Sequence, residues 1–326
     1  MMRCNTWRVL GVMLFIAVTG LFVIQLIHVY TIKPYSLCHT GTNTNNTGKI
    51  LQRLFLCHRF HGGLGNLLYK FASAYAIARE NNMKLVSVKD EGIAAALEYP
   101  PEILQDNGYC ARLPVLKEDK CCSYDPKFLN ISRSVNVDGY LQSWIYFQKY
   151  SDDLRQLIVF KEALVEQAKK LLDKELDRRY DQTSKSFRTL VGMHIRRGNK
   201  LEAYYVKYGY KVAPAHYIVR AMKYFNDRFQ NLTFVVVTED QKWAMENIPE
   251  NNDVIFMKKN HAVVDMIILT LMDHTIMTVG TFGWWAAWLT NGTTVYYKDF
   301  VEPNTKFGKQ HGLDHSDHIL PGWIPL

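Results

Sequence analysis

Short apolar strands alternate with helices from Leu54 to the C-terminus, and this alternation constrains the fold more than any other feature of the chain. Strands that alternate with helices predict parallel sheets covered on both faces. The expected strands are Leu54–His58, Lys84–Val88, Val135–Leu141, Leu190–Ile195, Thr233–Val237, Val254–Met257, Ile276–Val279 and Thr294–Tyr297.

The helices between these strands divide the chain into two halves. The expected helices are Leu67–Glu80, Pro214–Phe225, Val263–Met272 and Trp284–Leu289, with a charged helical bridge at Asp152–Lys185. We therefore predict an α/β fold in which two Rossmann-like domains face a cleft. Residues 51–185 form the N-terminal domain with its helical linker, and residues 186–326 form the C-terminal domain. Ligands of such sheets bind outside the carboxyl ends of the strands.

An uncharged apolar run, Val9–Ile27, precedes the globular part. As a helix it would span roughly 28 Å, close to the hydrocarbon thickness of a bilayer. A cleaved signal peptide would be shorter and would end in a small-x-small site, which is missing here. Residues 9–29 are therefore expected to anchor the chain in a lipid bilayer. Arg3 and Arg8 predict a cytosolic tail at residues 1–8 and a lumenal remainder, which begins with a stem at residues 30–50.

Sequons and cysteines agree with a lumenal location. Cys38, Cys57, Cys110, Cys121 and Cys122 would be lumenal and free to form disulfides, whereas Cys4 would be cytosolic. Because five is an odd number, one lumenal thiol is free or bridges to another chain, and the pairing stays open. The N-x-S/T sequons, which are candidate glycosylation sites, are Asn45, Asn130, Asn231 and Asn291.

Composition excludes two classes of protein. The chain has 48 % hydrophobic and 21 % charged residues, which is ordinary for a globular protein and argues against disorder. Its formal net charge is +8, but no Lys/Arg block carries interleaved aromatic residues. We therefore expect no nucleic-acid partner.

The segment Val191–Asn199 takes an apolar strand directly into two arginines and a glycine. Side chains alternate along a strand, so His194 and Arg196 should share one face and Arg197 the other. At a strand's carboxyl end, the planar guanidinium of Arg196 can donate two parallel hydrogen bonds to a phosphate. The alternative is an arginine pair at a strand end that is solvated or forms surface salt bridges, and the tripeptide alone does not separate the two.

A second segment carries an acid and a glycine turn. Asp265 is a candidate reader of guanine, because a carboxylate can accept both N1–H and N2–H of that base, and its alternative role is to cap a helix. The run Thr278–Trp284 leads a strand into a helix, whose free N–H groups after Gly283 would face a phosphate. Trp284, Trp285 and Trp288 are expected to pack in the core.

The first glycine turn contains Gly63, Gly65 and Asn66. It lacks the third glycine of a dinucleotide fingerprint, so NAD is not indicated. The turn can still bring the backbone close to a ligand, and Asn66 can both donate and accept hydrogen bonds.

Missing motifs narrow the chemistry further. No Asp-x-Asp occurs, so a metal bridging a nucleotide diphosphate is not expected, and there is no Walker A lysine motif. His311, His315 and His318, with Asp314 and Asp317, match no zinc spacing and are expected to form a solvated tail. We predict no metal and no cofactor.

Taken together, the segments resemble the galactoside α1,2-fucosyltransferases, glycosyltransferase family 11. The resemblance runs from about Leu54 to the C-terminus, and weaker matches to the family lie at Gly139–Trp144 and Trp323–Ile324. The motifs that carry it are Gly63–Asn66, Gly192–Asn199 and His274–Gly283.

This resemblance implies a GT-B fold and metal-independent, inverting transfer of fucose from GDP-L-fucose, which is a substrate, to O2 of a galactose-terminated glycan. It also implies a single-pass type II protein of the Golgi membrane. His194 and Asp265 would contact guanine. Arg196, Thr281, Phe282 and Gly283 would sit at the diphosphate, with Arg197, Gly63 and Gly65 as further donor contacts. Asn66 would act near the transferred sugar.

The sequence departs from the family at Asn199, where the family usually has aspartate after Arg-Arg-Gly. If that carboxylate is the general base, the amide cannot replace it, and Glu202, Asp138 or the departing phosphate would take the proton. Alternatively, the aspartate is structural. Competing functions are a protein O-fucosyltransferase, a core α1,6-fucosyltransferase and an inactive glycan-binding homologue. Oligomerisation stays open.

Overall fold

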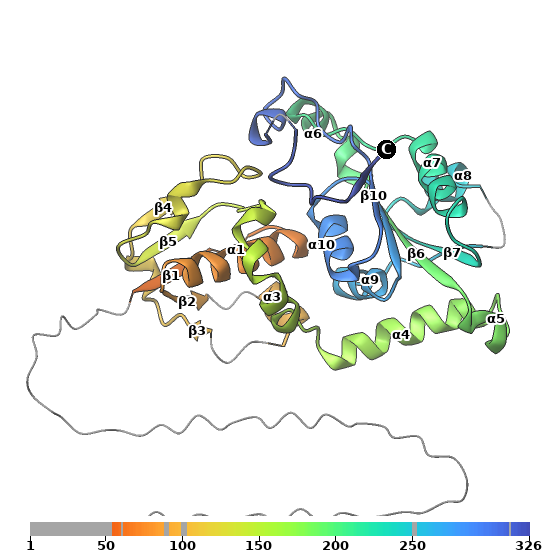
Figure 1. Cartoon of the computed structure of the whole chain (residues 1–326), viewed down its shortest axis with the longest axis horizontal. Helices are drawn as coiled ribbons and strands as arrows, with labels where there is room; N and C mark the ends of the chain where they lie inside the picture. Colours follow the sequence, from red (N-terminus) through yellow and green to blue (C-terminus); the bar gives the residue numbers. More distant parts are fainter. Residues whose placement is uncertain (1–53, 60, 88–90, 99–102, 250–252, 313) are drawn as a thin grey trace, which may run out of the picture. The chain divides into compact units, whose positions relative to one another are not determined.

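Two parallel β-sheets organise the chain in the computed structural model, which describes residues 54–59, 61–87, 91–98, 103–249, 253–312 and 314–326 (Figure 1). The first sheet has the order β3-β2-β1-β5-β4, and the second has the order β11-β10-β9-β6-β7-β8. Neighbouring strands pair in parallel throughout both sheets. The predicted α/β fold with parallel sheets is confirmed.

The strands of the first sheet are β1 (Phe55–His58), β2 (Lys84–Ser87), β3 (Leu104–Gln105), β4 (Val115–Lys117) and β5 (Val135–Asp138). Those of the second are β6 (Thr189–Ile195), β7 (Leu232–Thr238), β8 (Val254–Phe256), β9 (His274–Met277), β10 (Thr294–Tyr296) and β11 (Ile324–Pro325). The α-helices are α1 (Leu64–Glu80), α2 (Glu91–Ala96), α3 (Ser151–Leu157), α4 (Glu162–Asp177), α5 (Gln182–Ser186), α6 (Ala203–Tyr208), α7 (Ala215–Asn226), α8 (Gln241–Asn247), α9 (Ala262–Thr270) and α10 (Thr281–Thr290).

The helical bridge expected at Asp152–Lys185 is broken into α3, α4 and α5. Between α3 and α4 the backbone is extended and pairs with the end of α2. Glu98 N–H donates to the Val159 carbonyl at 2.8 Å, and Lys161 N–H donates to the Ala96 carbonyl at 3.1 Å. Tertiary pairing therefore overrides a helical sequence pattern at this position.

The apolar run Val9–Ile27, the expected tail and stem, and Asn45 lie outside the described residues. None of the helices in the described ranges has both the length and the apolar character needed to cross a bilayer.

Residues Leu51–Leu326 form one compact unit. The two sheets divide between residues 138 and 189, and a domain boundary near residue 185 stays a prediction.

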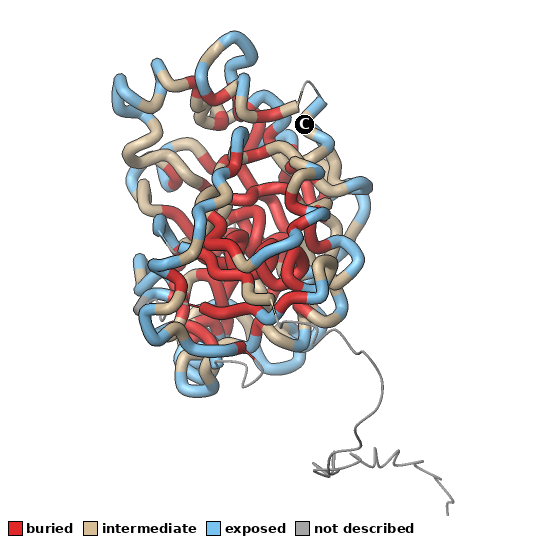
Figure 2. The backbone as a smooth tube through the Cα atoms, turned by 90° about the vertical axis from the view of Figure 1, so that its left-hand side faces the viewer, coloured by how far each residue is buried: buried red, intermediate tan, exposed pale blue. Residues whose placement is uncertain are grey.

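Helices α1 and α10 pack against each other and so connect the part of the chain that carries the first sheet with the part that carries the second. Tyr69 of α1 lies with its ring centroid 4.6 Å from that of Trp284 and 5.3 Å from that of Trp285. Both tryptophans are fully buried, as predicted for core residues. Figure 2 shows the buried backbone concentrated in the interior of the folded part.

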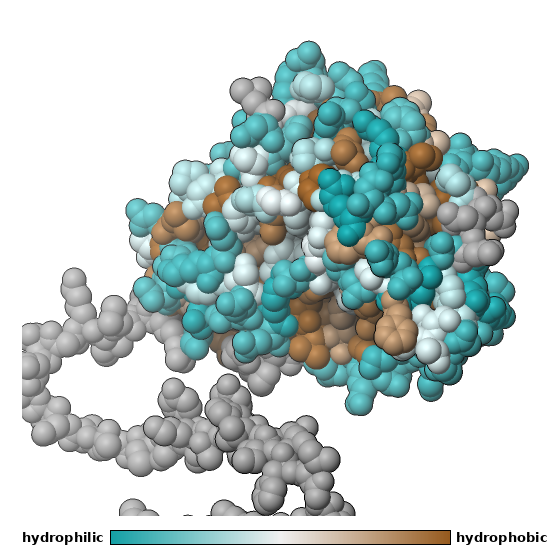
Figure 3. Space-filling view, turned by 45° about the vertical axis from the view of Figure 1, so that its right-hand side comes forward, coloured by the Kyte–Doolittle hydropathy of each residue, from teal (hydrophilic) through white to brown (hydrophobic). Residues whose placement is uncertain are grey.

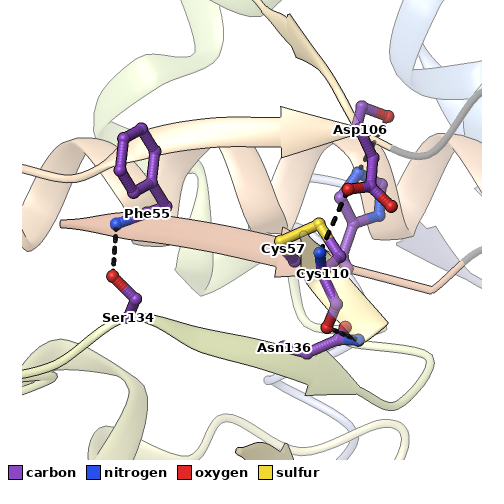
Figure 4. Close-up of a disulfide and its surroundings, with 8 residues drawn as sticks. Phe55, Cys57, Asp106, Cys110, Ser134 and Asn136 are labelled. Atoms are coloured by element: carbon purple, nitrogen blue, oxygen red, sulfur yellow. Dashed lines mark hydrogen bonds between the residues drawn. A yellow bond between two sulfur atoms is a disulfide. The ribbon is translucent and has the colours of Figure 1, made fainter. Parts of the chain in front are cut away.

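A disulfide between Cys57 and Cys110 ties β1 to the short 3-10 helix Cys110–Arg112 (Figure 4). The carbonyl of Cys110 accepts from Asn136 Nδ2 at 3.1 Å, and its N–H donates to Asp106 at 3.0 Å. The bridge closes a segment with a sequence separation of 53 residues. In the chain-entropy model, a loop of that length contributes about 4 kcal/mol to stability. Cys121 and Cys122 are free thiols.

The surface is polar over much of the face in Figure 3, with apolar side chains in separate patches. Of the predicted glycosylation sites, Asn130, Asn231 and Asn291 are exposed. Asn231 and Asn291 have positive φ values of 53° and 59°, which asparagine tolerates better than most residues. The amide oxygen of Asn291 also accepts from Arg155 at 3.0 Å.

Candidate functional site

A cavity of about 740 Å³ opens where strands β6, β7 and β9 end. His194 and Arg196 reach it from the end of β6, Thr238 and Glu239 from the end of β7, and Gly280 from the turn after β9. The first half of the chain adds the turn Gly63–Asn66, together with Tyr140 and Gln142. Ligands of parallel sheets bind at the carboxyl ends of the strands, so this cavity has the position of a binding site.

Arg196 lines the cavity with a guanidinium that is held from two sides. Nη1 donates to Glu239 Oε1 at 2.5 Å, and Nη2 donates to Asn199 Oδ1 at 2.5 Å. The backbone N–H of Arg196 donates to Thr278 Oγ1 at 2.9 Å. The side chain still keeps 31 % of its surface exposed, so an oriented cation with accessible N–H groups faces the cavity.

Arg197 lies outside this cavity, on the other face of the strand end, as alternation predicts. Its Nε donates to Asp240 at 3.2 Å, and its guanidinium stacks 3.7 Å above the ring of Trp243. The side chain of Arg197 therefore does not reach the cavity with the other predicted donor-binding residues, although its backbone N–H donates to Glu239 Oε1 at 2.8 Å.

The turn before α10 places the start of that helix at the cavity. Gly280 has φ of +98°, a conformation that favours glycine, and the helix begins at Thr281, three residues before the expected Trp284. The expected start after Gly283 is therefore wrong. The tryptophans marked the helix in the sequence, but its first turn, which begins at Thr281, precedes them. N–H groups of the first turn of a helix have no intrahelical partner and favour anions. Thr281 and Phe282 line the cavity.

Gly65 allows the start of α1 to touch the start of α10. A Cβ added at Gly65 would lie 2.5 Å from the carbonyl carbon of Thr281 and 2.6 Å from the backbone nitrogen of Phe282. A Cβ added at Gly63 would meet nothing within 4 Å. Both glycines line the cavity, but the close approach that requires glycine is between two helix ends.

Asn66 joins these two helix ends. Its Oδ1 accepts a hydrogen bond from Thr281 Oγ1 at 2.8 Å and another from Gln142 Nε2 at 3.0 Å. All three side chains line the cavity. Two segments that are far apart in sequence are thereby fixed at one wall of the site.

His194 is buried beneath Phe282 and Gly283. The His194 and Phe282 ring centroids lie 5.0 Å apart, and a Cβ added at Gly283 would lie 2.6 Å from His194 Nδ1. Burial lowers the pKa of His194 to about 4, with a further lowering by Arg196 that the carboxylate of Glu239 opposes. The imidazole is therefore neutral near pH 7, with a donor nitrogen and an acceptor nitrogen.

Asp265 lies in the first turn of α9 and lines the cavity. The N-cap position of this helix is taken by His261, whose ring accepts from Val263 N–H. Asp265 accepts from Asn260 Nδ2 at 2.9 Å, and burial raises the pKa of its carboxyl group. Asp265 is thus not the N-cap of α9, and its carboxylate can accept hydrogen bonds from a ligand in the cavity.

The two proposed bases, Glu202 and Asp138, do not line the cavity. Within the described residues, the carboxylates that do line it are Glu239 and Asp265. Sequence reasoning missed Glu239, although it directly follows the end of β7, where site residues are expected. It also missed the tyrosines that line the cavity, because aromatic residues in a short helix look like packing.

His311, His315 and His318 do not form a solvated tail. His311 and His318 are each 6 % exposed, and both line the cavity. The His318 carbonyl accepts from Trp284 Nε1 at 2.7 Å, and its Nδ1 lies 3.1 Å from the Gln142 carbonyl. The segment folds back onto α10, which the local sequence did not indicate.

Comparison with known proteins places the chain in a family. The model of the family described as Glycosyl transferase family 11 matches residues 127–326. The galactoside alpha-(1,2)-fucosyltransferase 1 of Oryctolagus cuniculus is 34 % identical over 192 residues, 58 % of this chain and 50 % of the relative. The protein of the same name from Alouatta caraya is 29 % identical over 278 residues, 81 % of this chain and 73 % of the relative. The chain spans about half the length of the first relatives it matches.

Among solved structures, the fucosyltransferase NodZ from Bradyrhizobium is similar with a TM-score of 0.47 and 14 % identity, covering 72 % of this chain and 91 % of that one. A NodZ alpha-1,6-fucosyltransferase soaked with GDP-fucose gives a TM-score of 0.48 at 14 % identity, covering 73 % and 92 %. With scores at this level, the fold assignment depends on strand order and packing alone. The family match covers more than half of the chain, and the chain therefore belongs to glycosyltransferase family 11.

Proposed function

We propose that this protein transfers L-fucose from GDP-fucose to O2 of a terminal galactose, forming an α1,2 linkage with inversion of the anomeric centre. Membership of family 11 and the printed name of the relatives, galactoside alpha-(1,2)-fucosyltransferase 1, support this activity. The two parallel sheets with a cavity lined from both halves support a GT-B arrangement.

One observation carries the proposal, namely that Arg196 and the start of α10 line the same cavity. Departure of the fucosyl group leaves negative charge on the GDP diphosphate. A fixed guanidinium and the free N–H groups of Thr281 and Phe282 would stabilise that charge as it develops. No Asp-x-Asp occurs in the sequence, so these groups take the place that a bridging metal has in other sugar-nucleotide enzymes.

The guanine would lie against His194, Phe282 and Asp265. Asp265 can accept both N1–H and N2–H of guanine, and Asn260 holds the carboxylate in position. Neutral His194 beneath Phe282 supplies a polar ring without adding charge. This arrangement would favour guanine over adenine, which has no such pair of donors.

Asn199 is compatible with activity in this proposal. Its amide oxygen accepts from Arg196 Nη2, as a carboxylate at the same position would. We therefore assign to residue 199 a positioning role, which an amide fills. The proton of the acceptor hydroxyl would pass to Glu239 or to the departing phosphate, since Glu202 and Asp138 do not line the cavity.

We further propose that residues 9–29 anchor the chain in the Golgi membrane with the folded part in the lumen. The Cys57–Cys110 disulfide supports an oxidising compartment, and exposed Asn130 and Asn231 are accessible to glycosylation there. Digestion with peptide N-glycosidase and protease protection of microsomes test this topology. Unglycosylated protein that proteases degrade in intact microsomes would contradict it.

The activity is tested by incubating the full chain with GDP-[14C]fucose and either a β-galactoside or a folded EGF-like domain. We expect label on the galactoside, with a linkage to O2 by methylation analysis. Label on the EGF domain alone, or an α1,6 linkage, would assign one of the competing fucosyltransferase activities. Binding of GDP without any transfer would identify an inactive homologue.

A further inference from the structure

Aromatic side chains line a part of the cavity that the donor does not require. We call Tyr140, Tyr204, Tyr205, Tyr208, Tyr210 and Phe307 the aromatic wall, and all six line the cavity. The Tyr210 and Phe307 rings stack at 4.0 Å, and Tyr208 stacks on Tyr210 at 6.0 Å and on Tyr204 at 6.3 Å.

The tyrosines of this wall keep their polar groups available. Within the described ranges, no hydrogen bond involves the phenol hydroxyl of Tyr140, Tyr204, Tyr205, Tyr208 or Tyr210. Among tyrosines buried elsewhere, Tyr217 donates to the Met277 carbonyl at 2.7 Å, whereas the hydroxyl of Tyr69 has no partner within the described residues. A tyrosine hydroxyl usually has a partner when it is buried. Free hydroxyls on a cavity wall are therefore available to a ligand.

The wall lies next to the groups assigned to the reacting sugar. Lys200 follows Asn199, which holds Arg196, and its ammonium lies 3.6 Å from the ring centre of Tyr210 and 4.1 Å from that of Tyr205. From the other half of the chain, Tyr140 is two residues before Gln142, which donates to Asn66. The wall thus borders the place between Arg196 and Asn66.

We propose that the aromatic wall is the subsite for the acceptor galactoside. The inference deepens the proposed function and depends on it for the identity of the reaction. One face of a β-galactopyranose presents C–H groups from C3 to C6, which suit an aromatic surface, while its hydroxyls suit the free phenols. Galactose held on this wall would direct O2 toward the sugar bound between Arg196 and Asn66.

The wall also continues beyond the cavity. Exposed fractions are 50 % for Leu201, 69 % for Tyr204 and 53 % for Val206, so one short stretch around α6 leaves three large apolar residues accessible. Apolar residues exposed together often mark a binding surface. We therefore expect galactosides with an apolar group at O1 to bind better than galactose.

The alternative is that these tyrosines only pack the protein. Packing explains Tyr210, whose ring contacts both Phe307 and Lys200. It does not explain Tyr204, which is mostly exposed, or the free hydroxyl of Tyr205. Tyr205 therefore separates the two explanations best.

The test uses the full chain and its Tyr205→Ala and Tyr205→Phe variants, with Tyr224→Ala as a matched control, because Tyr224 is also a half-buried tyrosine but does not line the cavity. Kd for GDP is measured by calorimetry, and Kd for phenyl β-galactoside by saturation-transfer NMR in the presence of GDP. Loss of the aromatic ring should weaken galactoside binding about tenfold and leave GDP binding unchanged. Tyr205→Phe keeps the ring and should weaken it by less.

The direct binding measurement separates failure of the inference from failure of the proposed function. If wild type binds the galactoside and GDP but transfers no fucose, the proposed function fails while the subsite can still be judged from Tyr205→Ala. The inference is overturned if Tyr205→Ala binds the galactoside as tightly as wild type and Tyr224→Ala do. Circular dichroism melting checks that each variant is folded.

Discussion

The Thr281 hydroxyl donates a hydrogen bond of 2.8 Å to Asn66 Oδ1, across a separation of 215 residues. This contact links the start of α10, which belongs to the helices around the second sheet, to the start of α1, which follows the first strand of the first sheet. Gln142 donates to the same oxygen at 3.0 Å. The geometry of the cavity wall therefore depends on one amide.

Two variants of Asn66 separate its structural role from its electrostatic role. Asn66→Ala removes the acceptor of two hydrogen bonds and should lower the free energy of unfolding by about 1–3 kcal/mol, measured by urea denaturation. Asn66→Asp keeps the acceptor but adds a negative charge near the proposed diphosphate site. It should unfold like wild type yet bind GDP more weakly by calorimetry. Equal GDP affinity in Asn66→Asp and wild type would contradict the placement of the diphosphate.

The same substitution, glycine to alanine, should have different effects on stability at Gly65 and at Gly63. Gly65→Ala places a Cβ 2.5 Å from the backbone of Thr281, so α1 and α10 must separate, at a cost of about 1–3 kcal/mol of stability. Gly63→Ala meets nothing within 4 Å at a φ of −77°, and its thermal midpoint should match that of wild type. Similar midpoints for both variants would show that the two helix ends do not touch.

Much of this fold could be predicted from local patterns. Strands such as Thr189–Ile195 and Leu232–Thr238 are apolar runs between turns, and the α/β class follows from their alternation with helices. The break between α3 and α4 could not be predicted, because it depends on pairing of Val159 and Lys161 with the end of α2. The short strands β3, β4 and β11 could not be predicted either, because two or three residues are too few to show the alternation of a strand.

The candidate site shows a similar division. His194, Arg196, Asp265 and Thr281 could be proposed because each lies next to a strand end or helix start that the sequence marks. Tyr140 and His318 come to the cavity through long-range contacts, such as the one between His318 Nδ1 and the Gln142 carbonyl, which no local pattern encodes. The Cys57–Cys110 pairing likewise depends on where the chain returns to β1.

Asn199→Asp tests the role of the residue after Arg-Arg-Gly. In this protein Arg196 already pairs with the carboxylate of Glu239, so a second carboxylate would give the group a net negative charge. Repulsion of the diphosphate should raise KM for GDP-fucose by roughly 2- to 10-fold, with unchanged thermal stability. A large rise in kcat without a rise in KM would instead indicate that an aspartate here serves as the general base.

Buried histidines make stability depend on pH. Burial lowers the pKa to about 4 for His194 and His318 and to about 3 for His58 and His311, below the value of 6.5 in the unfolded chain. The unfolded state then binds more protons below pH 6.5, so stability is present above that pH and is lost as the pH falls toward 4. Each histidine contributes a slope of up to about 1.4 kcal/mol per pH unit.

Glu118 acts in the opposite direction, because burial raises its pKa to about 7 and the folded state takes up that proton first. Four histidines outweigh one carboxyl group, so urea denaturation should give a lower unfolding free energy at pH 5 than at pH 7. His318→Asn should make the slope shallower by about one proton. Equal stability at both pH values would contradict neutral burial of these rings.

The central claim is that Arg196 contacts the diphosphate of the donor. Calorimetry of GDP and of guanosine with wild type, Arg196→Ala and Arg197→Ala tests it most directly, since guanosine lacks the phosphates and Arg197 lies outside the cavity. We predict that Arg196→Ala weakens GDP binding roughly 10- to 100-fold and leaves guanosine binding unchanged, while Arg197→Ala binds both like wild type. Unchanged GDP affinity in folded Arg196→Ala would contradict the account.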